Sequence, residues 1–88
     1  MLNRIKTSEI SQFIENKTPF ITSNGTSQAY FNDKGDFCVF SYNTLILQLS
    51  PNNDILEFEN SYFSITTSKL QNIIKKIFNI KEKKWTTN

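Results

Sequence analysis

Residues 64–84, SITTSKLQNIIKKIFNIKEKK, contain the most regular pattern in the chain. Their apolar side chains recur at the spacing that forms one face of a helix: Leu70, Ile73, Ile74, Ile77 and Phe78. Lysines occupy the opposite side. The pattern predicts an amphipathic helix from about Ser68 to Lys84, with Thr66 or Thr67 as its N-cap and its lysine face in solvent.

Upstream of this segment, from Phe20 onward, apolar and polar residues alternate, and turn signals interrupt the alternation every several residues. This pattern predicts antiparallel strands at about 19–23, 27–32, 36–42, 44–50 and 55–59. In the fourth strand the alternation places Leu45, Leu47 and Leu49 on the core face. The pair Asn24-Gly25 predicts a two-residue type I′ turn, because both residues tolerate a positive φ.

At the amino terminus, Thr7 or Ser8 is a suitable N-cap for a short helix over residues 8–16, and Pro19 ends it. We therefore predict an α+β fold, in which an antiparallel meander of four to five strands carries both helices on one face. At 88 residues the chain can form only one core, so residues 1–88 are expected to be a single domain. We place its core at about 7–82, with residues 83–88 as a tail.

Composition narrows the chemistry that is available. The chain has one cysteine, Cys38, and no histidine. These counts exclude an internal disulfide, a cysteine–histidine nucleophile and a thiolate zinc site, and we expect Cys38 to be buried and structural. The eight carboxylates are dispersed apart from Glu57 and Glu59. We predict no metal, no cofactor and no catalysis, in a soluble cytoplasmic protein with no segment that spans a membrane.

Three segments resemble a small domain of unknown function found in bacteriophage and other mobile-element proteins. That domain is recognised by a Ser-Tyr-x-Thr-x-Ile segment followed by Tyr-Ser-x-Thr-Thr-Ser-Lys-x-Gln. The corresponding residues here are 41–46, SYNTLI, and 63–72, FSITTSKLQN, and the upstream 23–26, SNGT, is similar to the entry turn of the family. The chain differs at Phe63, where tyrosine is usual, and at Leu70, where histidine is expected. The resemblance implies a phage or mobile-element origin and leaves the biochemistry open.

The charge of the chain is unevenly distributed. Residues 69–88 carry six lysines and one glutamate (+5), while residues 1–68 carry four basic and seven acidic side chains (−3). This asymmetry indicates either a solvated helix face or a surface for a charged partner. The candidate partner-binding residues are Lys69, Lys75, Lys76, Lys83, Trp85, Asp54, Glu57 and Glu59.

A second candidate site is the run Thr66, Thr67, Ser68 and Lys69 at the start of the predicted helix. Its hydroxyls, backbone N–H groups and lysine would suit an anion, although simple helix capping is the alternative. Trp85 would either pack back on the domain or act as an exposed anchor.

These observations favour a non-enzymatic phage or mobile-element accessory protein that binds a host protein, such as a CRISPR effector, and so inhibits a bacterial defence system. The alternative is a single-stranded nucleic-acid-binding protein that combines the lysine face with exposed aromatics. The candidate stacking residues are Tyr30, Phe31, Tyr42, Tyr62 and Trp85. An exposed edge strand would also allow two copies to pair as a homodimer.

Overall fold

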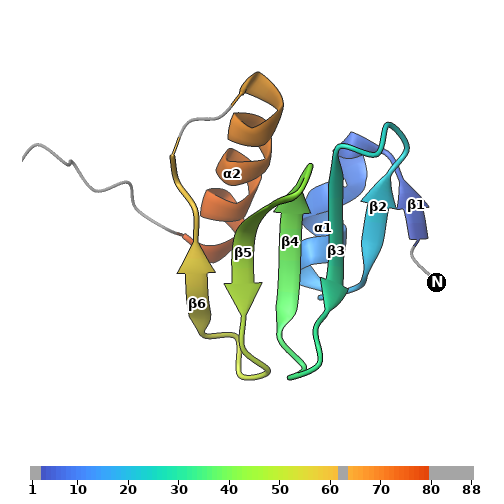
Figure 1. Ribbon diagram of the computed structural model, residues 1–88. Helices are drawn as coiled ribbons and strands as arrows, with labels where there is room; N and C mark the ends of the chain where they lie inside the picture. Colours follow the sequence, from blue (N-terminus) through green and yellow to red (C-terminus); the bar gives the residue numbers. More distant parts are fainter. Residues whose placement is uncertain (1–2, 62–63, 80–88) are drawn as a thin grey trace, which may run out of the picture.

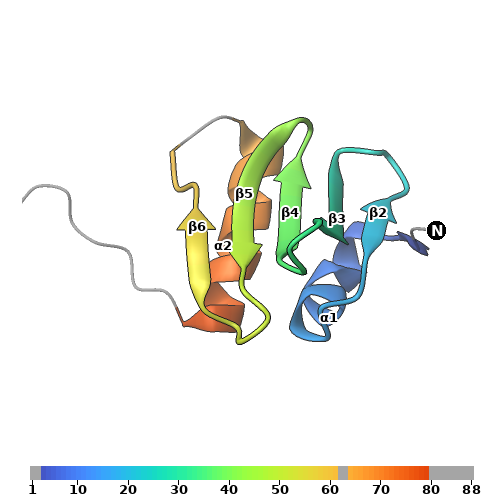
Figure 2. The ribbon, with the colours of Figure 1, turned by 60° about the horizontal axis from the view of Figure 1, so that its bottom comes forward.

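The computed structural model describes residues 3–61 and 64–79. They form a single sheet with strand order β1-β2-β3-β4-β5-β6 and two α-helices (Figure 1). The elements are β1 (Asn3–Ile5), the 3-10 turn η1 (Thr7–Glu9), α1 (Ile10–Glu15), β2 (Phe20–Thr22), β3 (Ser27–Phe31), β4 (Phe37–Ser41), β5 (Thr44–Leu49), β6 (Ile55–Phe58) and α2 (Ile65–Phe78). Figures 1 and 2 show both helices on one face of the sheet, and no described helix covers the other face, called here the open face. The predicted α+β class is confirmed.

The predicted number of strands is wrong, because the sheet has six strands rather than four or five. The additional strand is β1, which pairs in parallel with β2, so the sheet is not a purely antiparallel meander. The backbone N–H of Ser23 donates to the carbonyl of Ile5 at 2.8 Å, and the side chain of Asn3 donates to the carbonyl of Pro19 at 3.0 Å. Three residues are too few to show a period of two, so local sequence does not reveal β1.

The amino-terminal helix lies close to its predicted range but is capped differently. Its first turn is η1, and the residue in the N-cap position is Lys6 rather than Thr7 or Ser8. The Glu9 carboxylate accepts a hydrogen bond from the Lys6 backbone N–H at 2.9 Å. This carboxylate therefore satisfies one of the free donors at the start of the helix.

Helix α2 starts one turn earlier than predicted. Its N-cap is Ser64, whose hydroxyl accepts a hydrogen bond from the backbone N–H of Thr67 at 3.2 Å, so Thr66 and Thr67 lie inside the first turn. The last helical residue is Phe78, and Asn79 follows in the left-handed conformation, with φ of 54°. Such a residue terminates a helix. The rest of the predicted helix, residues 80–84, lies outside the described residues.

The core lies between the sheet and the two helices. It contains twelve buried apolar residues: Ile5, Ile10, Ile14, Phe20, Ala29, Phe37, Val39, Ile46, Leu47, Leu49, Leu70 and Ile74. They come from α1, α2 and the five strands β1 to β5, so one continuous cluster joins the amino-terminal and carboxyl-terminal elements.

The predicted alternation of the fourth strand fails at one residue. Val39 pairs with Leu47 and Phe40 pairs with Leu45, which leaves Ile46 as the extra residue of a β-bulge. Ile46 is fully buried, whereas Leu45 is only half-buried and pairs with Phe40 on the opposite face. The prediction is therefore correct for Leu47 and Leu49 and wrong for Leu45.

Candidate functional site

Three segments that are far apart in the sequence meet at one end of the sheet: the β2–β3 loop, the β4–β5 turn and the first turn of α2. The backbone N–H of Tyr42 donates to the carbonyl of Thr26 at 2.7 Å. The hydroxyls of Ser41 and Thr67 are 2.7 Å apart in the core. The described residues of the three segments that carry the family resemblance therefore lie together at this end of the sheet.

The β2–β3 loop is organised by the side chain of Asn24. Its Oδ1 accepts hydrogen bonds from the Thr22 hydroxyl at 2.8 Å, the Thr26 hydroxyl at 2.9 Å and the Thr26 backbone N–H at 3.2 Å. Only Gly25 in this loop has a positive φ, +74°, so the predicted two-residue type I′ turn is wrong. The connection is longer, because β2 ends at Thr22 and β3 begins at Ser27.

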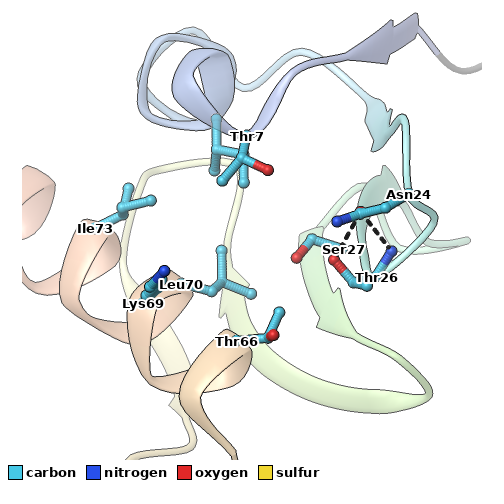
Figure 3. A pocket seen from close by; sticks show the side chains of 9 residues that line it. Thr7, Asn24, Thr26, Ser27, Thr66, Lys69, Leu70 and Ile73 are labelled. Carbon is cyan, nitrogen blue, oxygen red and sulfur yellow. Dashed lines mark hydrogen bonds between the residues drawn. The ribbon is translucent and has the colours of Figure 1, made fainter.

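A pocket of about 140 Å³ lies between this loop, the amino-terminal segment and α2 (Figure 3). Its lining residues are Thr7, Ile10, Asn24, Thr26, Ser27, Thr66, Lys69, Leu70 and Ile73. Figure 3 shows the side chains of Thr7, Ser27 and Thr66 around the same space. The pocket combines an apolar wall from the two helices with a polar wall from the loop and from the first turn of α2, called here the α2 entry.

The four residues of the predicted anion site do not lie together around one space. Thr66 and Lys69 line the pocket, but Thr67 is buried and hydrogen-bonded to Ser41 and Ser64, and Ser68 is not part of the lining. Four polar residues of the pocket were absent from the prediction: Thr7, Asn24, Thr26 and Ser27. Two of these, Asn24 and Thr26, belong to a segment that the resemblance had marked, but only the fold brings it to α2.

The predicted lysine face is partly described. Lys69 and Lys76 are exposed on α2, and Lys75 is half-buried. Lys83, Trp85 and the candidate stacking residue Tyr62 lie outside the described residues. The lysines of α2 therefore lie in the helical layer, away from the open face of the sheet (Figure 2).

The segment over residues 35–68, called here the acidic half, is acidic in sequence, and one lysine from outside it, Lys17, lies against it and donates from its ammonium to the Pro51 carbonyl at 3.4 Å. Residues 35–68 contain four carboxylates and no lysine or arginine. Glu57 is exposed on β6 and pairs with Gln48, Asp54 lies in the β5–β6 turn, and Glu59 directly follows β6. Hydrogen bonds from the side chain and the backbone of Ser61 lower the pKa of Glu59, which favours its charged form. The predicted acidic residues thus lie together along and beside one edge strand.

The open face of the sheet carries aromatic residues. Ala29 and Val39 are buried under the helices, and the alternating neighbours Tyr30 and Phe40 therefore lie on the open face. Their rings are stacked, with centroids 5.2 Å apart. Tyr30 remains 38% exposed, so this pair provides an aromatic surface next to the acidic half.

Cys38 lies between these aromatics in sequence and is only 5% exposed, as predicted for a buried cysteine. Burial raises the pKa of its thiol, and the nearby negative charge of Asp36 raises it further. Asp36 itself accepts a hydrogen bond from the side-chain amide of Gln48 at 2.9 Å. The thiol is thereby kept in its protonated, less reactive form.

In the described part of the chain, no group of three or more His, Cys, Asp or Glu side chains is arranged to hold a metal ion. Neither helix described there has the length and apolar character needed to cross a membrane.

Fold and site together define a small α+β domain with one face of its sheet covered by helices, a polar pocket at the α2 entry, and an open, partly acidic face. The chain belongs to a family of unknown function (DUF8033), whose model matches residues 8–87. No curated protein and no solved structure matches the chain.

Proposed function

We propose that this protein is a non-enzymatic accessory protein of a phage or mobile element that acts in the bacterial cytoplasm. It docks the acidic half of its sheet into a basic groove of a host protein. The nucleic-acid channel of a defence machine such as a CRISPR effector has the required charge. By occupying that channel, the protein would inhibit the machine.

The observation that carries this proposal is the separation of charge. The segment from β4 to the start of α2 bears carboxylates only, and Asp54, Glu57 and Glu59 cluster around the edge strand β6. Complementary charge steers a partner and sets the orientation of the complex. A basic groove is the complement of this surface.

Apolar groups beside the carboxylates supply contact area for such a complex. Leu56 is 49% exposed and Ile55 is 41% exposed on β6, next to Glu57. On the open face, Tyr30 stacks on Phe40, and Tyr42 in the β4–β5 turn is 54% exposed. Aromatic residues with a charged rim are typical of the energetic centre of protein–protein interfaces.

The alternative, binding of single-stranded nucleic acid, needs lysines and stacking aromatics on the same surface. Here Lys69 and Lys76 lie on the helical layer, whereas Tyr30 and Phe40 lie on the open face of the sheet. A strand would have to pass around the domain to contact both groups. This geometry favours the protein-binding proposal.

The test is affinity purification from the bacterium that carries the gene, with wild-type protein and two charge-reversal variants. Asp54→Lys/Glu57→Lys is expected to reduce recovery of the partner by at least about tenfold, because two attractive contacts become repulsive. Lys76→Glu reverses the charge of an exposed side chain on the helical layer. It is the matched control and is expected to retain the partner.

The ionic strength of the wash gives a second measurement. Recovery of the partner should fall between about 0.1 M and about 1 M salt, where the screening length drops from about 10 Å to about 3 Å. Equal recovery by both charge-reversal variants would refute the acidic half as the docking surface. A complex with nucleic acid but no host protein would instead support the alternative.

A further inference from the structure

We propose that the pocket at the α2 entry binds a tetrahedral oxyanion the size of a phosphate group. Lys69 supplies the opposite charge, and the hydroxyls of Ser27 and Thr66 donate hydrogen bonds. This site is separate from the acidic docking surface and does not depend on it.

Ser27 provides the main evidence. It is only 3% exposed and lines the pocket. Its backbone is hydrogen-bonded to Thr22, but within the described residues its side-chain hydroxyl has no partner, and Figure 3 shows it directed toward the pocket. Among the described residues no fully buried side-chain oxygen or nitrogen lacks a partner, so this hydroxyl is accessible through the pocket, where it is free to donate a hydrogen bond to a ligand.

The other polar groups of the pocket are also donors. All hydrogen bonds given to the Asn24 side chain use its Oδ1, and one of them comes from a backbone N–H, which fixes the orientation of the amide. Its NH₂ group is therefore left as a donor beside the pocket. No side-chain hydrogen bond occupies Thr7, Thr66 or Lys69 among the described residues. The pocket thus presents an ammonium, an amide and several hydroxyls.

Charge and size define the ligand. The nine lining residues include one lysine and no carboxylate, and Thr66 belongs to the first turn of α2, where the helix dipole is positive. A volume of about 140 Å³ is below the range of about 300–1,000 Å³ typical for drug-sized ligands. An oxyanion of phosphate size, free or as the end group of a small molecule, satisfies both limits.

The test is an NMR titration of the full chain with inorganic phosphate. The signals monitored are the backbone amides of residues 24–27 and 65–70. Wild-type protein is expected to show saturable shifts at these amides. Lys69→Ala should weaken binding by about tenfold or more, because the charged donor is lost. The control Lys76→Ala removes an exposed lysine of the same helix that does not line this pocket, and it should leave the affinity unchanged.

Ser27→Ala should also weaken phosphate binding, and the spectrum of the free variant verifies that its fold is retained. Glycerol phosphate, titrated in parallel, shows whether an esterified phosphate is accepted, and saturable binding of either phosphate supports the site. The proposal is overturned by three results: no saturable binding of either compound, equal weakening by Lys76→Ala and Lys69→Ala, or equally tight binding of acetate.

Discussion

Phe20→Ala is expected to lower the free energy of unfolding by about 3–5 kcal/mol, the range for truncation of a buried phenylalanine. Phe20 is fully buried on β2, and its ring packs edge-on against Phe13 of α1 with centroids 6.2 Å apart. The substitution would therefore open a cavity between sheet and helix. Domains have a total stability of about 5–15 kcal/mol, and one of this size is expected near the lower end. The variant should be marginally folded at best.

Urea unfolding followed by far-ultraviolet circular dichroism measures this effect. Phe31→Ala is the matched control, because Phe31 lies on the neighbouring strand but is 46% exposed. It is expected to cost about 1 kcal/mol. Similar losses for the two variants would contradict the position of the core between β2 and α1.

Breaking the hydrogen bond between Ser41 and Thr67 is expected to have the second-largest effect. The two hydroxyls are 2.7 Å apart, and both residues are at most 2% exposed. Ser41→Ala or Thr67→Val would leave the remaining hydroxyl without this buried partner, at a cost of about 1–3 kcal/mol each. Threonine and valine have similar helix propensities, so the loss from Thr67→Val would reflect the contact.

A double-mutant cycle separates this contact from local effects. The double variant Ser41→Ala/Thr67→Val should be destabilised by less than the sum of the single variants, with a coupling of about 1 kcal/mol. Ser68→Ala, one residue further along α2, should change stability by less than about 0.5 kcal/mol. Strict additivity of the two substitutions would contradict the direct contact between β4 and α2.

The predictions from sequence are most accurate where a regular pattern of apolar residues extends over several turns of a helix. The apolar stripe of α2 was correctly placed, and Leu70 and Ile74 are fully or almost fully buried. The start of this helix was predicted one turn too late, because residues 64–68 contain four hydroxyl side chains, any of which can serve as an N-cap. Only the surrounding fold selects Ser64, since Thr67 is needed by Ser41 in the core.

The errors in the sheet have a common cause. The bulge at Ile46 and the short strand β1 both depend on how a strand pairs with its neighbour: β5 with Val39 and Phe40 of β4, and β1 with β2. A strict period of two cannot represent an extra residue, so Leu45 was assigned to the wrong face. Gly25 was correctly expected to have a positive φ, whereas Asn24 acts through its side chain instead.

The pocket could be predicted only in part for the same reason. Thr66 and Lys69 were recognised from their positions near the helix start. Ser27, which is the most informative residue of the pocket, has no distinctive local pattern. Its role follows from its position in the pocket lining, where its otherwise buried side chain presents a hydroxyl that makes no hydrogen bond to another described side chain or backbone group. These are properties of the folded chain.

The proposed docking surface is tested most directly by site-specific photo-cross-linking in the bacterium that carries the gene. A photoreactive phenylalanine replaces Leu56, which is 49% exposed beside Glu57, or Asn72, which is exposed on α2. The account predicts a protein adduct from position 56, involving a host protein with a basic groove, and none from position 72. An adduct from position 72 with none from position 56 would contradict it.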